Sequence, residues 1–403
     1  MKRFSIGVFA LAAAAAAAGC GSSGQWAGST ETAKSVAQTY AKIVHQSYAD
    51  SLQAGQALAG AIDDLLAAPT ADGLEAAKQA WLDSREPYLQ TEVYRFYDGP
   101  IDNPEDGPEG MLNAWPIDEA YVDYTEDAAD AGMINDDDVD LTLPFLRGQN
   151  ELGSEDNIAV GYHPIEFLLW GQDTTPPSAH LPGQRSYTDY LADKGPHAAH
   201  ADRRAQYLRL LGEGLIDDLT QVRDAWDLSD PSSYGSKFVA GDSSAAIEKI
   251  LRGMITLSGS EFAGERLQVA LDSGDQEDEH SCFSDNTHRD MVGDAKGIQN
   301  VWRGTYAALD SANDVSGPGV QALVEELDPA LAAEIGAQIA KSLQLAEALR
   351  PTPTDPAFDE LISRGNTAGN AKVQALIDSL RVQAKLLERV YDQLGFSAAR
   401  PGG

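Results

Sequence analysis

The stretch Gly161-Tyr162-His163-Pro164-Ile165-Glu166 places an imidazole and a carboxylate three residues apart. Proline is tolerated in the first turn of a helix, because its missing N–H would have no partner there. The apolar run Phe167–Trp170 continues the expected helix, so His163 and Glu166 project from roughly the same face. These two ligand types suit zinc, iron or manganese, whereas calcium and magnesium prefer oxygen atoms alone. Two ligands do not complete a site, so a hydrogen-bonded pair at a helix start is the alternative.

A second group of side chains shares one face of a helix expected earlier in the chain: Trp81, Arg85, Tyr88 and Glu92. Their spacing of four, three and four residues predicts a single stripe. The two aromatic residues alone would be ordinary core residues, but buried Arg85 and Glu92 would each need a partner. They could pair with each other or with His163 and Glu166. A structural ion pair beneath the kink expected at Pro87 is the alternative.

Residues 274–290 form a dense polar connection between two expected helices. Its carboxylates and two histidines, among them Asp278 and His280, could bind a cation or support the contact between two parts of the protein. Asp285 or Asn286 is a natural N-cap for the helix that follows. A charged, solvated turn is the alternative, and the EF-hand pattern is not met.

Several common chemistries are excluded because their motifs are missing from the sequence. There is no His-Glu-x-x-His motif or its inverted form, no Cys-x-x-Cys-His haem site, no nucleotide-binding loop and no Gly-x-Ser-x-Gly elbow. The formal net charge of −34 excludes a nucleic-acid binder of the usual basic kind. The same charge could concentrate cations near a cleft, although the acidic surface of a secreted or salt-adapted protein is the simpler explanation of it.

The N-terminus predicts export and lipid attachment. Residues 1–19 form a signal peptide with a basic start and an apolar core, and that core is too short for a convincing membrane span. Cys20 follows in a sequence that resembles a bacterial lipoprotein box, although Ala17 replaces the usual leucine. Residues 20–28 would form a flexible tether after lipidated Cys20. Gly21 in place of aspartate predicts the outer membrane, so we expect a periplasm-facing lipoprotein of the bacterial envelope.

The remaining sequence predicts an all-α protein. Helices are expected at 29–66, from Leu74 through Val93 to about Asp98, at 163–170, 199–226, 243–273, 286–311, 319–349 and 356–394. Long polar connections are expected at 99–157, with one short helix near Asp118, and at 173–198. No run of alternating β-branched residues predicts a strand. Because 403 residues exceed the usual size of one core, we expect two antiparallel helix bundles, 29–229 and 240–395. Cys282, the only other cysteine, is expected to be buried and inert.

Taken together, the Gly161-x-His163-x-x-Glu166 element, the helix face that begins at Trp81 and the stretch 275–288 resemble the imelysin-like family. The long acidic stretch is most similar to the branch called iron-regulated protein A. The resemblance covers residues from about 30 to 395. It implies two four-helix-bundle-like halves packed around a shared cleft, in a bacterial envelope protein linked to iron acquisition. Some relatives were described as an insulin-cleaving membrane protease.

The resemblance makes His163 and Glu166 the supposed metal-binding or active centre, and it places Arg85 and Glu92 at the same cleft. The leading hypothesis is a lipid-anchored protein that binds iron, or a small iron-bearing ligand, between its halves and serves iron uptake. His163, Glu166 and Glu92 would be ligands, with zinc as the alternative metal, and Arg85 would orient an anionic group. The expected residues that support the cleft are Trp81, Tyr88, Asp278 and His280.

Two other classes of function stay open. A metallopeptidase would use Glu166 as general base on a metal-bound water and His163 as a ligand. The absence of a standard zinc-protease spacing argues against it, so a non-enzymatic role is favoured. A metal-free envelope scaffold would bind a partner protein or small ligand in the cleft. The lipid anchor would be the only contact with the membrane, and the sequence names no protein partner.

Overall fold

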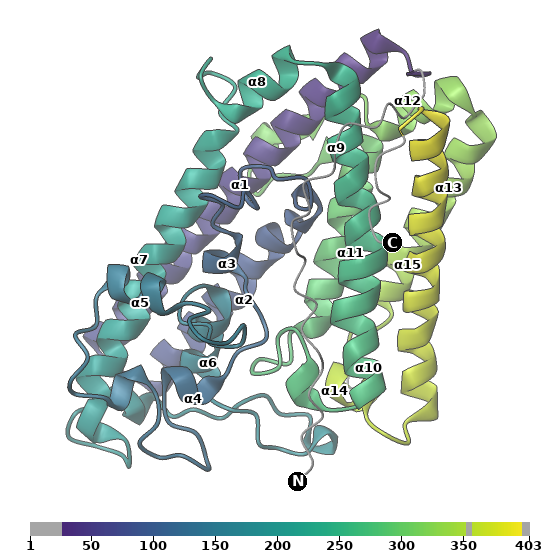
Figure 1. The fold of residues 1–403 in the computed structure, drawn as a ribbon. Helices are drawn as coiled ribbons and strands as arrows, with labels where there is room; N and C mark the ends of the chain where they lie inside the picture. Colours follow the sequence, from purple (N-terminus) through teal and green to yellow (C-terminus); the bar gives the residue numbers. More distant parts are fainter. Residues whose placement is uncertain (1–25, 352–356, 397–403) are drawn as a thin grey trace.

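The computed structural model describes residues 26–351 and 357–396, and it is built almost entirely from helices (Figure 1). The predicted signal peptide, Cys20 and most of the predicted tether lie outside the described residues. The all-α prediction is therefore confirmed for the described part of the chain.

Four helices organise the first part of the chain: α1 (Thr30–Ala67), α2 (Ala71–Leu89), α6 (Tyr162–Trp170) and α7 (Ala201–Ala225). Both α1 and α6 pack against α2 and α7. The Ser29 hydroxyl accepts a hydrogen bond from the Thr32 N–H and so caps α1. The apolar residues that recur at helical spacing along α1, such as Tyr40 and Ile43, are buried. The predicted helices at 29–66, 163–170 and 199–226 are confirmed.

The second part of the chain is a set of helices that pack on one another: α9 (Ser243–Thr256), the π-helix η6 (Leu257–Gln268), α10 (Val269–Ser273), α11 (Thr287–Arg303), α12 (Val320–Leu327), α13 (Pro329–Glu347), α14 (Phe358–Ile362) and α15 (Thr367–Gln393). The last helix, α15, packs against α9, η6 and α13, while α11 packs against α12, α13 and α2. The contact between α2 and α11 joins the two parts of the chain, and it passes beside the predicted site.

Shorter elements occupy the connections: η1 (Glu92–Tyr94), α3 (Glu109–Leu112), α4 (Glu119–Val122), η2 (Met133–Asn135), α5 (Leu143–Gln149), η3 (Pro177–Ala179), η4 (Tyr187–Tyr190), η5 (Ala198–His200), α8 (Tyr234–Ala240), η7 (Gln276–Asp278), η8 (Ser311–Asn313), β1 (Thr305–Tyr306) and β2 (Val315–Ser316). The short helix expected near Asp118 is α4, and the Asp118 carboxylate caps it by accepting a bond from the Ala120 N–H. The other short elements were not predicted, because segments of two to seven residues carry too little periodicity.

Two predicted boundaries are wrong for identifiable reasons. The helix α2 ends at Leu89 instead of continuing to about Asp98, because Pro87 lies inside its last turn and the Thr91 N–H bonds back to Tyr88 in a tighter turn. The helix expected at 286–311 ends at Arg303. The chain then forms the two-residue antiparallel pair of β1 and β2, which is too short to show alternation in the sequence.

The other two long helices of the second part are each divided. The helix expected at 319–349 breaks at Asp328, whose carboxylate accepts a bond from the Leu331 N–H and so starts α13 at Pro329. The helix expected at 356–394 is interrupted between α14 and α15, where Asn366 caps α15. In both segments a capping side chain starts a new helix. The apolar residues repeat at helical spacing across the break, so periodicity alone predicted one longer helix.

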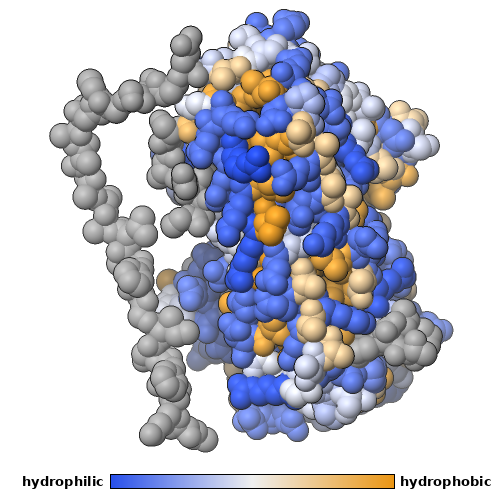
Figure 2. Space-filling view, turned by 90° about the vertical axis from the view of Figure 1, so that its right-hand side faces the viewer, coloured by the Kyte–Doolittle hydropathy of each residue, from blue (hydrophilic) through white to orange (hydrophobic). Residues whose placement is uncertain are grey.

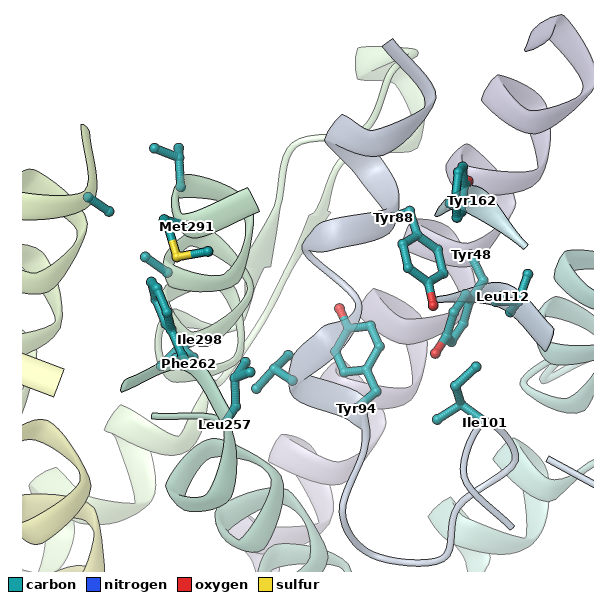
Figure 3. Packing of buried hydrophobic residues seen from close by; sticks show 14 of the residues in the cluster. Tyr48, Tyr88, Tyr94, Ile101, Leu112, Tyr162, Leu257, Phe262, Met291 and Ile298 are labelled. Carbon is teal, nitrogen blue, oxygen red and sulfur yellow. The ribbon is translucent and has the colours of Figure 1, made fainter. Parts of the chain in front are cut away.

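Buried apolar side chains from both parts of the chain belong to one continuous cluster. Figure 3 shows its middle, where Tyr88 and Tyr162 lie beside Tyr48 and Tyr94 on one side, and Phe262 and other residues of the second part lie opposite. The Tyr88 and Tyr162 rings are 4.9 Å apart, which places the end of α2 directly against the start of α6. The core therefore holds α6 rigidly at the boundary between the two parts.

The outer surface is mainly hydrophilic. Figure 2 shows one such face, on which narrow apolar strips lie between hydrophilic side chains. Among residues 26–351 and 357–396, every helix falls short of the length and apolar character needed to cross a bilayer. The single described cysteine, Cys282, is buried as predicted.

Candidate functional site

Gly161 fixes where α6 begins. Its backbone has φ +97° and ψ −166°, a conformation that is essentially restricted to glycine. A β-carbon at this position would lie 2.6 Å from the Leu112 carbonyl oxygen, so α3 and the start of α6 touch through bare backbone. This close approach buries His163 and Glu166 in the first turn of α6, where they are 1 % and 0 % exposed.

His163 and Glu166 contact each other, as their spacing predicted. Nδ1 of His163 lies 3.1 Å from Oε2 of Glu166, and Oε1 of Glu166 accepts bonds from the Ser284 N–H (3.0 Å) and hydroxyl (2.6 Å). Burial raises the pKa of Glu166 to about 8, against the opposing effect of Ser284. Burial and the nearby Arg85 charge lower the pKa of His163 to about 3, so the ring is neutral at pH 7. Its Nε2 atom is buried and has no hydrogen-bond partner among the described residues.

A second histidine and carboxylate form a similar pair beside the first. Nδ1 of His280 lies 2.7 Å from Oδ2 of Asp290, which also accepts a 2.6 Å bond from the Ser281 hydroxyl. The His163 and His280 rings are 4.9 Å apart and meet edge to face. Burial lowers the pKa of His280 well below its usual value, so this ring is neutral too. Histidines that bind metals usually place the second ring nitrogen against a carboxylate in this way.

The His280 ring lines a cavity of about 350 Å³ between the two parts of the chain. Arg95 and Glu109 contribute from the first part of the chain, and Glu261 and Arg266, both on η6, contribute from the second. The cavity is lined by residues from both parts of the chain, and it is large enough for a hydrated ion or a small ligand.

Behind this cavity, Glu92 is held by two arginines. Its Oε2 atom accepts bonds from Arg95 (2.8 Å) and Arg266 (2.5 Å), and Arg266 also pairs with Asp294 at 3.0 Å and Glu261 at 3.1 Å. Burial acts to raise the pKa of Glu92, but the Arg266 and Arg95 charges outweigh it and hold that pKa well below its usual range. Glu92 is therefore a fully compensated carboxylate in η1, off the α2 stripe on which it was expected.

Arg85 and Glu92 do not pair with each other. The Arg85 Nη1 atom donates a 2.6 Å bond to the Asn113 side chain, whose amide in turn lies 3.4 Å from Glu92. The Arg85 Nη2 atom lies 3.7 Å from Oδ1 of Asp290, and the guanidinium is 4.8 Å from the Tyr162 ring centroid. Arg85 therefore connects the end of α2 to the His280 pair, through partners that its spacing could not identify.

Two of the predicted supporting residues, Trp81 and Tyr88, contact the start of α6. Trp81 Nε1 donates a 3.0 Å bond to the Tyr162 carbonyl, and Tyr88 packs on the Tyr162 ring. Asp278 ends η7 and is not among the residues that line the cavity. Sequence reasoning missed Arg266, Asp294, Asn113, Ser284 and Asp290. Ser284 and Asp290 carried a signal, because both lie within the polar stretch 274–290.

Among the described residues, no group of three or more His, Cys, Asp or Glu side chains is arranged to hold a metal ion. The geometry explains why the three predicted ligands do not converge. His163 and Glu166 touch, but Glu92 is engaged by two guanidinium groups. The groups in this arrangement that suit a metal are the two neutral imidazoles of His163 and His280. Among the described residues, the buried Nε2 atom of His163 has no hydrogen-bond partner.

Glu279, next to His280, makes stability depend on pH. It is 1 % exposed, and neither carboxylate oxygen has a hydrogen bond of normal geometry. Burial, Asp359 and Asp285 raise the pKa of Glu279 well above its usual value, with a smaller opposing effect of Thr287. The folded protein therefore keeps a proton that the unfolded chain releases above about pH 4.5.

We expect the free energy of unfolding to fall as the pH rises from 5 to 8, by up to about 1.4 kcal/mol per pH unit from this group. Glu279→Gln should reduce that slope, because glutamine is neutral at every pH. Urea denaturation of both proteins across this range measures the difference. The exposed Glu75→Gln is the matched control and should leave the slope unchanged. Equal slopes for wild type and Glu279→Gln would contradict the prediction.

The chain is similar to known proteins in sequence and in fold. The family model described as Imelysin, which carries a peptidase label, matches residues 44–387. The chain is 26% identical over 323 residues to iron-regulated protein A of Synechococcus elongatus, covering 78% of this chain and 74% of that protein. Two crystal structures share the fold. One is a candidate iron-regulated protein A precursor from Parabacteroides distasonis, with TM-score 0.67, 20% identity and coverage of 92% of this chain and 96% of that one. The other is an imelysin-like protein from Psychrobacter arcticum, with TM-score 0.64, 16% identity and coverage of 93% and 99%.

Proposed function

This chain belongs to the imelysin family, and from that premise we propose that it binds iron, or a small iron-bearing ligand, in the cavity bounded by its two parts. The observation that carries the proposal is the pair of histidines, 4.9 Å apart, each with Nδ1 against a buried carboxylate. His280 lines the cavity, and His163 lies directly behind it. The name of the Synechococcus relative, iron-regulated protein A, supports iron as the metal.

We assign the two imidazoles as the metal ligands, and Glu166 and Asp290 as the groups that orient them. A metal on Nε2 requires the ring proton on Nδ1, where each carboxylate is placed to accept it. Because Glu166 is mostly protonated at pH 7 without metal, binding should release protons. Glu92 would act as a further ligand only if it left both Arg95 and Arg266, so we propose that its main role is to hold those arginines in the cavity wall.

The same geometry favours binding over peptidase chemistry. A general base must reach a metal-bound water, but Glu166 is 0 % exposed, and its two oxygens are engaged by His163 and Ser284. Its pKa of about 8 also leaves it mostly protonated at neutral pH. A metal-free scaffold is the remaining alternative, and the unpartnered Nε2 atom of His163 argues against it.

The sequence of the N-terminus supports a cellular location for this function. We propose that lipid on Cys20 anchors the chain to the bacterial envelope, facing the periplasm, and that residues 29–229 and 240–395 act as two halves on either side of the cavity. In that position the protein would serve iron uptake. Mass spectrometry of the exported protein tests the anchor, because an unmodified Cys20 would remove it.

Titration with Fe(II), Fe(III) and Zn(II) tests the binding proposal. We expect His163→Ala and His280→Ala each to weaken binding by about 100-fold or more, and Glu166→Gln by about 10- to 100-fold. The matched control is His180→Ala, because His180 is half exposed and pairs with Glu360 at a distance from the cavity lining. Calorimetry gives the affinities, and circular dichroism checks that each variant is folded. Equal affinity in wild type and in both folded histidine variants would eliminate the site.

A further inference from the structure

The cavity wall carries an excess of negative charge. Five glutamates and two arginines line it. Both arginines already have carboxylate partners: Arg95 lies 2.8 Å from Glu92 and 3.0 Å from Glu109, and Arg266 lies 2.5 Å from Glu92 and 3.0 Å from Asp294. Neither guanidinium is therefore available as a free positive charge for a bound ligand.

Three of the lining glutamates stand outside those ion pairs. Glu151 and Glu155 follow α5, Glu265 comes from η6, and all three are exposed. Other carboxylates pair with Arg95 and Arg266. The charges of these three glutamates are therefore not compensated by an arginine, and they act on any ion or ligand that enters the cavity. Clefts lined by one sign of charge focus the electrostatic field and raise the local concentration of the opposite ion.

The groups at the inner end of the cavity also suit a cation. His280 is in the wall, and His163 behind it has a buried Nε2 atom without a partner. Arg85 is the nearby cation with unpartnered N–H groups, but it is 0 % exposed and does not line the cavity.

We propose that this cavity takes the metal as a hydrated cation and rejects anionic metal chelates, with Glu151, Glu155 and Glu265 as the residues that make this selection. The inference rests on the proposed function and narrows it to one class of ligand. A polycarboxylate chelate of iron would bring negative charge to a mouth that already carries three uncompensated carboxylates. A hydrated Fe(II) ion would be attracted by the same groups and could pass on to the two imidazoles.

The test compares two probes, anaerobic Fe(II) and ferric citrate, on the full chain. The variant Glu151→Gln, Glu155→Gln, Glu265→Gln removes the three charges without shortening a side chain. The matched control is Asp127→Asn, Asp138→Asn, Asp140→Asn, which removes three exposed charges that do not line the cavity. Both variants change the net charge equally, so only the position of the charge differs.

We expect the association rate of Fe(II), measured by stopped flow, to fall about tenfold in the cavity variant and to lose most of its dependence on ionic strength. The control should keep the rate within about twofold of wild type. Ferric citrate should bind wild type more weakly than Fe(II) does, and the cavity variant should bind it better than wild type.

Ferric citrate that binds wild type as tightly as Fe(II) would overturn the inference. So would a control variant that slows Fe(II) as much as the cavity variant does. A failure of the proposed function looks different, because wild type would then bind neither probe, or both folded histidine variants would bind Fe(II) as wild type does.

Discussion

Replacing Arg266 with methionine should lower the free energy of unfolding by about 3–5 kcal/mol, because it leaves buried carboxylates without their counter-charge. Arg266 is 1 % exposed, and it joins Glu92 of η1 to Asp294 of α11, which are 1 % and 0 % exposed. Methionine keeps the aliphatic part of the arginine side chain, so the loss combines the missing charge with the space that the guanidinium leaves. Guanidinium denaturation of wild type and variant measures it.

A surface arginine provides the control for this effect. Arg389 pairs with Glu334 at 3.3 Å, but both side chains are more than half exposed, so Arg389→Met should cost about 1 kcal/mol or less. Neutralising the stranded carboxylates with Glu92→Gln and Asp294→Asn should restore part of the stability lost in Arg266→Met. If Arg266→Met cost no more than the control, the ion-pair network would not be holding the two parts of the chain together.

Gly161→Ala should destabilise the protein by about 2–6 kcal/mol and weaken Fe(II) binding as well. A residue with a β-carbon adopts the Gly161 backbone conformation only at a cost of about 1–3 kcal/mol. Forcing an extra methyl group into a packed site destabilises the protein by about 1–3 kcal/mol more. The atom it would meet is the Leu112 carbonyl oxygen, 2.6 Å away, which belongs to the backbone and cannot rotate aside. The start of α6 must shift, and it carries His163 and Glu166 with it.

Denaturation and Fe(II) titration of the same protein sample test both parts of this expectation. The control is Gly60→Ala, because Gly60 lies on α1 with nothing within 4 Å of the new β-carbon. Alanine favours a helix interior by about 0.5–1 kcal/mol over glycine, so this substitution should stabilise the protein. A Gly161→Ala protein as stable as wild type would show that α3 and α6 can separate without cost.

Local signals in the sequence were sufficient to predict α1, α6 and α7. In α1, apolar residues recur at helical spacing and Ser29 supplies the cap, and both features act within a few residues of each other. The π-helix η6 was hidden, because its apolar residues are compatible with an ordinary α-helix over the same range. The ends of α2 and α11 depended on hydrogen bonds that periodicity does not record.

The candidate site could be predicted only in part, for a related reason. His163 and Glu166 are three residues apart on one helix, so their contact follows from helix geometry. The bond between Glu92 and Arg266 joins residues 174 positions apart, and Ser284 reaches Glu166 across 118 positions. The spacing of residues in one sequence does not indicate such pairs. A buried charged residue needs a partner, but the sequence does not show which residue that partner is.

The wide turns of η6 restrict how the length of this chain can vary. Within it, Arg266 bonds to Glu261 five positions earlier, a separation that fits a π-helix and not an α-helix. Removing one residue from this segment, with its winding unchanged, would rotate everything after it by up to about 100°. Both Arg266 and the helix α10 would then face away from their present neighbours. An insertion or deletion in η6 would therefore disturb the wall of the cavity and the α15 contact together.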